Sequence, residues 1–249
     1  MSLNASEKTG RSFFVADLHL TDERPVATGR FFRFLQEEAA GADALYILGD
    51  LFEAWVGDDH DEQVAHDTAQ QLRSLVDAGT PVYFMHGNRD FMLAARYAAQ
   101  SGMTLLADPA RIDLYGTPTL LMHGDTLCTD DIAYQTFRRR MRHPLTLSLL
   151  RRLPFSWRRR LARQARAGSE SAKAGKTAAI MDVNADAVVR ELRRQQVCRL
   201  IHGHTHRPAR HVHVVDGRDC ERWVLPDWYA RWGYVVCDAA GCALRVEDL

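Results

Sequence analysis

Short apolar runs alternate with amphipathic helical segments along most of this chain of 249 residues. A run of about five apolar residues bounded by glycine or polar residues is typical of a buried strand. Strand candidates of this kind lie at 12–16, 44–48, 81–85, 117–122 and 198–202. Helical segments lie at 25–40, at 90–100 and at about 184–196, and a further one follows the strand at 44–48 and ends at about residue 78. This order predicts an α/β fold in which the strands run parallel.

The C-terminal part of the chain has a different pattern. Apolar and polar residues alternate there, which suits antiparallel strands, in the runs 212–215, 222–225, 233–237 and 243–246. We also expect Asp90 to cap the helix that ends near residue 100, and Gly102 to terminate it.

Residues 129–182 contain helix-forming runs but no strand candidate. Apolar side chains recur every four residues, at Leu145, Leu149, Leu153, Trp157 and Leu161, and Pro154 should divide the segment into two helices. We therefore expect an inserted helical cap at 129–182. The core would consist of 12–128 and 183–249, preceded by an N-terminal extension at 1–11.

The cap segment carries a strong positive charge, although the whole chain has a formal net charge of zero. Between residues 132 and 169 there are eleven arginines and no Asp or Glu. The segment could be a solvated helix face, a nucleic-acid surface or an interfacial cap. It contains no nucleic-acid reading motif, so we expect no nucleic acid as a partner. Leucines and Trp157 between the arginines favour burial among acyl chains and anionic head groups.

Composition argues against membrane spanning and secretion. No stretch approaches 18 uncharged apolar residues, and the first residues lack an apolar signal region. The five cysteines are odd in number and contain no CxxC pair, so we expect no disulfide framework and reduced thiols in a cytosol.

Five strand candidates are each followed by residues that can bind metal ions. Parallel strands deliver such residues to one edge of a sheet, so we expect the side chains to converge. They offer three carboxylate or amide oxygens and four imidazoles, on Asp17, His19, Asp50, Asn88, His123, His204 and His206. The set is too large for one tetrahedral zinc ion and suits two ions such as Mn²⁺, Fe²⁺ or Zn²⁺. Asp50 is the candidate bridging ligand, because a carboxylate has two oxygens.

Other polar residues also lie near these strand ends. We interpret His86, His143 and His202 as structural or supporting residues rather than ligands. Asp90 and Asp125 either orient imidazoles and water or serve as turn and capping residues.

The motifs D-x-H at 17–19, G-D at 49–50, G-N at 87–88, H-G-D at 123–125 and G-H-x-H at 203–206 resemble the calcineurin-like metallophosphoesterase superfamily. The resemblance spans about 12–246. It implies a β-sandwich flanked by helices, with two metal ions at the strand ends.

Longer segments, among them 46–59, 86–91, 122–131 and 202–209, resemble the UDP-2,3-diacylglucosamine pyrophosphatase family of the lipid A pathway. The resemblance implies two Mn²⁺ ions, although other divalent transition metals are possible. Asp17, His19, Asp50 and His206 would hold one ion, and Asp50, Asn88, His123 and His204 the other. It assigns substrate binding to Asn88, Arg89, Asp131, Ser169, Lys173, Lys176 and His204. Lys173 stands where that family commonly has Asn.

Arg89 points to the same reaction on chemical grounds. Many metallophosphoesterases have a histidine after the G-N pair, which protonates an alkoxide leaving group, whereas this chain has a permanent cation. A pyrophosphate releases a phosphate monoester, whose second pKa is about 6, so it leaves as an anion without protonation. Asn88 and Arg89 are thus the candidate catalytic residues.

The sequence therefore predicts a hydrolase in which water attacks the α-phosphorus of UDP-2,3-diacylglucosamine. The products would be UMP and 2,3-diacylglucosamine 1-phosphate (lipid X). We expect a cytoplasmic enzyme on the inner face of the inner membrane, with the acylated UDP-sugar and an anionic membrane surface as partners. The alternatives are a metallophosphoesterase for soluble or cyclic nucleotides and a non-catalytic scaffold of the same fold.

Overall fold

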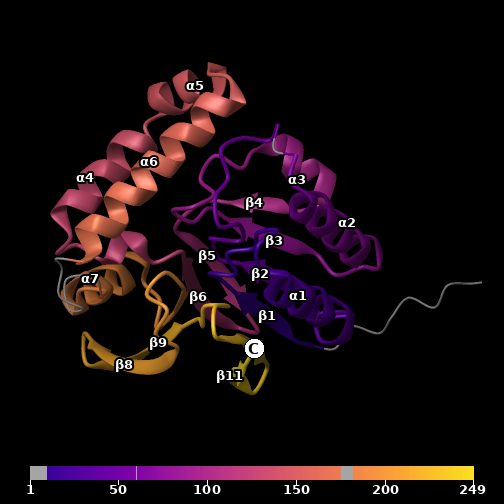
Figure 1. Cartoon of the computed structure of the whole chain (residues 1–249). Helices are drawn as coiled ribbons and strands as arrows, with labels where there is room; N and C mark the ends of the chain where they lie inside the picture. The colour runs from indigo at the N-terminus through magenta and orange to yellow at the C-terminus, as the bar shows by residue number, and fades with distance from the viewer. Residues whose placement is uncertain (1–9, 60, 175–181) are drawn as a thin grey trace, which may run out of the picture.

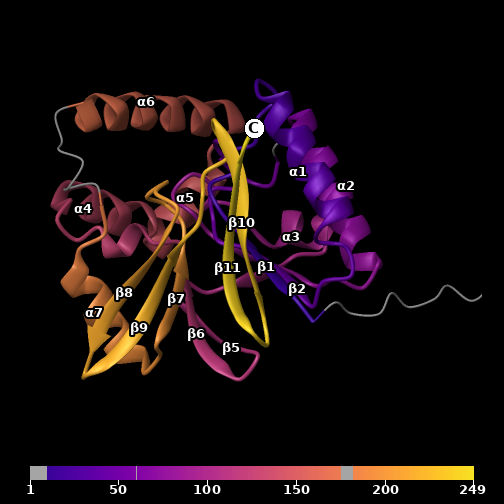
Figure 2. The ribbon, with the colours of Figure 1, turned by 90° about the horizontal axis from the view of Figure 1, so that it is seen from below.

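The computed structural model describes residues 10–59, 61–174 and 182–249, and it consists of two packed β-sheets flanked by helices (Figures 1 and 2). The first sheet has the order β11-β10-β1-β2-β3-β4. Its strands are β1 (Ser12–Val15), β2 (Ala44–Ile47), β3 (Val82–Met85), β4 (Thr104–Leu106), β10 (Arg231–Asp238) and β11 (Gly241–Asp248). The second sheet has the order β5-β6-β7-β9-β8. Its strands are β5 (Ala110–Leu114), β6 (Thr117–Met122), β7 (Arg199–His202), β8 (Ala209–Val215) and β9 (Arg218–Val224).

Helices cover the outer faces of both sheets. The first sheet is covered by α1 (Pro25–Glu37), α2 (Gln63–Asp77) and α3 (Ala95–Ser101), which Figure 1 shows grouped on one side. The second sheet packs on α7 (Ala185–Gln195). The predicted α/β fold and the β-sandwich flanked by helices are confirmed.

The alternation of side chains along each strand explains the layers. Phe13 of β1 packs with Phe34 and other residues of the helical side, whereas its neighbour Phe14 lies in the cluster between the two sheets. That inner cluster also contains Leu121 of β6 and Ile201 of β7. Because successive side chains of a strand point to opposite faces, one short apolar run supplies both layers of the core.

The strands that precede the candidate ligands are parallel to their neighbours. β1 pairs with β2 and β2 with β3 in parallel, and β6 pairs with β7 in parallel. Their carboxyl ends therefore open on one edge of the sandwich. β2 lies in the middle of the first sheet, so Asp50 follows a central strand.

The arginine-rich segment forms three helices: α4 (Ile132–Met141), α5 (Pro144–Arg152) and α6 (Phe155–Ala174). Figure 1 shows them together, away from α1, α2 and α3. Pro154 separates α5 from α6, but the expectation of two helices was wrong, because a further break at 142–143 separates α4 from α5. The inner side of α5 contacts the core through Leu147 and Leu150.

Two other expectations about local structure were wrong, and two strands were not predicted. α3 begins at Ala95 and Asp90 does not cap it, because the Asp90 carboxylate is engaged elsewhere. The short strands β4 and β5 were missed. Cys237 and Cys242 form a disulfide, although no disulfide was expected. These cysteines lie directly opposite each other on β10 and β11, with Cα atoms 4.1 Å apart, and a search for CxxC spacing does not detect such a cross-strand pair.

Candidate metal centre

The seven side chains named as candidate metal ligands converge at the carboxyl ends of the strands. Asp17 Oδ1 lies 3.3 Å from His206 Nε2. The Asp50 carboxylate lies between two imidazoles, 3.9 Å from His19 Nε2 on one side and 3.9 Å from His123 Nε2 on the other. Asn88 joins the same group, because its Oδ1 lies 3.1 Å from His123 Nε2 and 2.9 Å from His204 Nδ1. Segments far apart in sequence thus form one cluster of oxygen and nitrogen donors.

The backbone at this cluster adopts an unusual conformation. Eight described non-glycine residues have a positive φ, and five of them are candidate ligands: Asp17, His19, Asp50, His204 and His206, with φ between 50° and 69°. Non-glycine residues rarely adopt this left-handed conformation, and it costs on the order of 1 kcal/mol or more each. Such strain persists where the surrounding fold imposes it, and here it turns the donors toward one point.

Two glycines allow the ligand loops to approach one another. A Cβ atom at Gly87 would collide with the Asp50 carboxylate, and one at Gly203 would collide with that of Asp17. Glycine at these positions lets the backbone pass directly beside the buried carboxylates.

The electrostatics of the cluster fit bound cations. Burial, together with the charges of Asp90 and Asp17, raises the pKa of Asp50 to about 7. Asp17 Oδ1 and both ring nitrogens of His19 are buried, and none of them makes a well-aligned hydrogen bond with the described residues. Two sets of donor atoms lie within 4.8 Å of one another: Asp17 with His19 and His206, and Asp17 with Asp50 and His123. Crowded buried carboxylates and unsatisfied imidazoles are the environment that a divalent cation stabilises.

The Asp90 carboxylate stabilises two loops that carry candidate ligands, rather than orienting an imidazole. Its carboxylate accepts hydrogen bonds from the backbone N–H groups of Leu51, at 2.7 Å, and Gly87, at 2.8 Å. It thereby joins the loop after β2, which carries Asp50, to the loop after β3, which carries Asn88.

Asp125 attaches the cap to the centre. Its buried Oδ2 accepts hydrogen bonds from the Tyr134 hydroxyl at 2.7 Å and from Arg138 Nε at 2.6 Å, and Arg142 lies 3.6 Å away. All three partners belong to α4 or its C-terminal cap residue. The Tyr134 ring also stacks over His204, with ring centroids 6.0 Å apart. The expectation that Asp125 orients imidazoles or serves in a turn missed this connection.

Arg89 is fixed beside Asp50. Its backbone N–H donates to Asp50 Oδ1 at 2.8 Å, and its carbonyl oxygen accepts from the Trp55 N–H at 2.9 Å. The Nε atom is buried and makes no hydrogen bond with the described residues. At least one donor of the guanidinium therefore has no partner among the described residues.

The other predicted substrate residues lie in or near the cap. Asp131 is the N-cap of α4, and its carboxylate accepts from the Tyr134 N–H. The side chains of Ser169 and Lys173 in α6, and the whole of Lys176, lie outside the described residues.

The three histidines interpreted as structural or supporting residues all make hydrogen bonds. His86 Nε2 hydrogen-bonds to the Leu93 carbonyl, and His143 accepts from the Leu145 N–H at the start of α5. His202 is buried beside Arg222.

Some arginines of the cap form contacts within the protein, whereas others are exposed to solvent. Arg158 is buried, where it donates to the Val56 carbonyl and pairs with Asp59, and Arg138 and Arg142 engage Asp125. Seven of the eleven are exposed: Arg139, Arg140, Arg151, Arg152, Arg159, Arg160 and Arg163. Exposed apolar side chains accompany them, among them Leu149 and Trp157. Among the described helices, none is both long and apolar enough to cross a bilayer.

Sequence reasoning missed Glu53, which links the cap to a candidate ligand. One carboxylate oxygen lies 3.4 Å from His19 Nδ1 and accepts from the Tyr229 hydroxyl, and the other pairs with Arg166 of α6 at 2.5 Å. Glu53 lies within the 46–59 segment, but no local pattern marks it as a partner of His19.

We expect Glu53→Gln to weaken Mn²⁺ binding by about tenfold, because a carboxylate that holds the far nitrogen of a ligand histidine fixes the orientation of the ring. Equilibrium titration of Mn²⁺ followed by electron paramagnetic resonance measures this. Glu38→Gln is the matched control, since Glu38 also pairs with an arginine, Arg30, but lies away from the centre. Equal Mn²⁺ affinity in both variants would contradict the role of Glu53.

The fold and the donor cluster define a phosphoesterase of the calcineurin-like class. The family model described as calcineurin-like phosphoesterase matches residues 10–208. This chain belongs to that family.

Its relatives share a more specific name. A protein named UDP-2,3-diacylglucosamine hydrolase from Enterobacter sp. (strain 638) is 49% identical over 233 residues, which cover 94% of this chain and 97% of that protein. One of the same name from Pseudomonas paraeruginosa (strain DSM 24068 / PA7) is 51% identical over 234 residues, 94% of each chain. A solved structure titled as a novel archaeal phosphodiesterase matches with a TM-score of 0.48 and 10% identity, over 96% of this chain and 99% of that chain. The resemblance stated from the motifs is confirmed.

Proposed function

We propose that this protein hydrolyses the pyrophosphate of UDP-2,3-diacylglucosamine to UMP and 2,3-diacylglucosamine 1-phosphate. The observation that carries the proposal is the cluster of seven donors joined to an apolar, arginine-rich cap through Asp125 and Glu53. The names of the relatives support the substrate.

Water would attack the α-phosphorus in line with the bond to the bridging oxygen. That bond breaks, and the oxygen leaves with the sugar 1-phosphate, while the oxygen of the water remains in UMP. When bound, two divalent cations would supply Lewis acidity at the phosphoryl oxygens and lower the pKa of water. Asp17, His19, Asp50 and His206 would hold one ion, and Asp50, Asn88, His123 and His204 the other.

Arg89 would stabilise the leaving group. The sugar 1-phosphate departs as an anion, so a permanent cation serves it better than a proton donor does. The two backbone hydrogen bonds of Arg89 hold its position beside Asp50 before substrate binds. The resemblance extends substrate binding to Asp131, Ser169, Lys173 and Lys176.

Mn²⁺ is the cofactor that we propose, since mixed imidazole and oxygen donors suit an octahedral transition metal.

We further propose that the seven exposed arginines and the apolar side chains of the cap dock on an anionic membrane from the cytoplasmic side. Binding of the purified protein to vesicles with and without anionic lipid tests the docking. Equal binding to both kinds of vesicle would contradict it.

The experiment that tests the reaction uses purified protein, Mn²⁺ and UDP-2,3-diacylglucosamine in ¹⁸O-labelled water. We expect one ¹⁸O atom in UMP and none in the sugar phosphate. Label in the sugar phosphate would contradict attack at the α-phosphorus. Faster hydrolysis of UDP-sugars without acyl chains, or of cyclic nucleotides, would favour the alternative phosphoesterase.

The cap predicts a preference for acylated ligands. We expect the double change Leu149→Ser and Trp157→Ser to weaken binding of the diacylated substrate by at least about tenfold, because each large apolar side chain contributes about 1.5–3 kcal/mol when buried. These side chains are 63% and 65% exposed, so they are available to acyl chains. UMP affinity should not change. Isothermal titration with each ligand measures the difference.

The matched control is Val212→Ser with Val214→Ser, which changes two apolar side chains on β8 that are 53% and 66% exposed. An equal loss of affinity for UMP and for the acylated substrate in the cap variant would contradict the assignment.

A further inference from the structure

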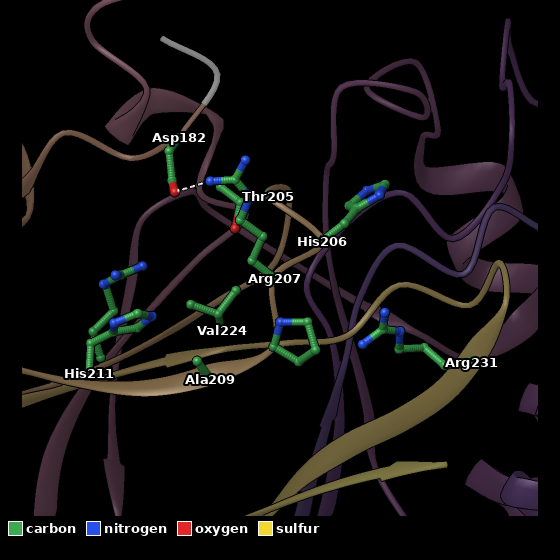
Figure 3. Close-up of a pocket in the computed structure, with 10 residues that line it drawn as sticks. Asp182, Thr205, His206, Arg207, Ala209, His211, Val224 and Arg231 are labelled. Atoms are coloured by element: carbon green, nitrogen blue, oxygen red, sulfur yellow. Dashed lines mark hydrogen bonds and ion pairs between the residues drawn. The ribbon is translucent and has the colours of Figure 1, made fainter. Parts of the chain in front are cut away.

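A cavity of about 370 Å³ lies beside the candidate metal centre. Its ten lining residues come from the loop after β7, from β8, β9 and β10, and from Asp182, rather than from the cap helices. Figure 3 shows His206 and Arg231 on one side of this pocket and His211 on the opposite side. His206 belongs both to the lining of the pocket and to the cluster of candidate ligands, where it contacts Asp17.

The charge of the pocket favours an anionic or carbonyl-rich ligand. Three arginines and one aspartate line it: Arg207, Arg222, Arg231 and Asp182. Asp182 is paired with Arg207 at 2.5 Å, as the dashed line in Figure 3 shows. A single carboxylate therefore faces three guanidinium groups.

Arg222 is the most unusual of these groups. It is only 7% exposed, yet its hydrogen bonds go to imidazoles rather than to a carboxylate. Its Nε atom donates to His213 Nε2 at 3.1 Å and its Nη1 atom approaches His202 Nε2 at 3.2 Å. A ring nitrogen that accepts a hydrogen bond carries no negative charge, so these partners orient the guanidinium without neutralising it. A buried cation of this kind is stabilised by an acceptor from a ligand.

Arg231 lies at the opposite end, near His206. Its side chain is exposed and makes no hydrogen bond or ion pair within the described parts of the chain. The positive charge of this guanidinium would attract a phosphate bound at the metal centre.

We propose that this pocket binds the nucleoside monophosphate half of the substrate, which rests on the proposed function. The α-phosphate lies at the metal centre beside His206 and Arg231. The ribose and the base extend toward Arg222 and His211, where a guanidinium can donate to the base carbonyls. A cavity of 370 Å³ is within the size range of small-ligand sites. The cap contacts the centre at His204 and, through Glu53, at His19, so the acylated half would lie under the cap.

Equilibrium binding of UMP and of inorganic phosphate to the Mn²⁺-loaded full chain tests the proposal. We expect the wild-type protein to bind UMP more tightly than phosphate. Arg231→Glu should weaken UMP binding by at least about tenfold, the loss typical of one charged hydrogen bond. Arg222→Lys should remove most of the preference for UMP over phosphate, since a lysine cannot donate in the same planar arrangement. Arg218→Glu, an exposed change on β9 outside the pocket, is the matched control.

The outcomes separate this proposal from the proposed function. The Arg231 side chain is exposed and has no ion pair among the described residues, so its variant should leave the core folded. UMP affinity within twofold of wild type in both pocket variants, with UDP-2,3-diacylglucosamine still hydrolysed, would overturn the pocket assignment alone. Wild-type protein that neither hydrolyses that substrate nor prefers UMP to phosphate would overturn both.

Discussion

Asp50→Asn should lower the hydrolysis of UDP-2,3-diacylglucosamine by at least about 10³-fold. Loss of one electrostatic contact to a transition state commonly costs about 10²–10³-fold, and Asp50 is the proposed bridge between two cations. Its carboxylate lies 3.9 Å from imidazoles on both sides, His19 and His123. Asparagine has nearly the same shape but one oxygen donor and no charge. Steady-state kinetics at saturating Mn²⁺ measure the loss.

The control for this change is Asp113→Asn, which alters an exposed carboxylate on β5 that accepts a hydrogen bond from the Gly116 N–H. The number of Mn²⁺ ions bound per chain should fall below two in Asp50→Asn and stay at two in the control. A variant at position 50 that retained two ions and nearly full activity would show that Asp50 does not bridge a metal pair.

The second large effect concerns stability. We expect Asp125→Asn to lower the free energy of unfolding by about 3 kcal/mol, because removing one charge from a buried ion pair leaves its partner uncompensated. The Asp125 side chain is fully buried, and its Oδ2 lies 2.6 Å from Arg138 Nε. Arg138 keeps a weaker partner in Asp108 at 3.3 Å, which places the effect at the lower end of the usual range. Urea unfolding measures the change.

The same variant should loosen the cap, since Tyr134, Arg138 and Arg142 all contact Asp125. Proteolysis within α4–α6 should become faster than in wild type. Asp216→Asn removes an exposed pair with Arg193 and should leave both measurements nearly unchanged. If Asp125→Asn were as stable and as protease-resistant as Asp216→Asn, the proposed anchor would be wrong.

Much of the fold could be predicted because its information is local. Apolar runs of four to six residues correspond to the buried strands β1, β2, β3, β6 and β7, and Pro154 separates α5 from α6. The convergence of the candidate ligands followed from one property of parallel sheets: their strands end on the same edge. The missed strand β4 has only three residues, too few to show an alternating pattern.

The supporting contacts could not be predicted, because they depend on how distant segments pack. Asp90 accepts from the backbone of Leu51, 39 residues away, and Arg166 of the inserted cap pairs with Glu53 of the core. The disulfide between Cys237 and Cys242 depends on the register of a hairpin, which puts the two residues opposite each other. A shift of one residue in that register would separate them.

The left-handed backbone at the ligands is a further feature that the sequence does not reveal. Asp and His can adopt positive φ, but nothing in the motifs indicates that Asp17, His19 and Asp50 all do so. The conformation is imposed by the hydrogen bonds of the surrounding loops, such as those from the His19 N–H to the Asp50 carbonyl and from the Asp17 N–H to the Gly49 carbonyl.

The central claim, that these loops hold two neighbouring cations, is tested most directly by anomalous diffraction from crystals of the Mn²⁺-loaded protein. We predict two manganese peaks about 3.5–4 Å apart, one on each side of the Asp50 carboxylate. One peak should contact His19 and His206, and the other His123 and His204. A single peak, or peaks away from Asp50, would contradict the account.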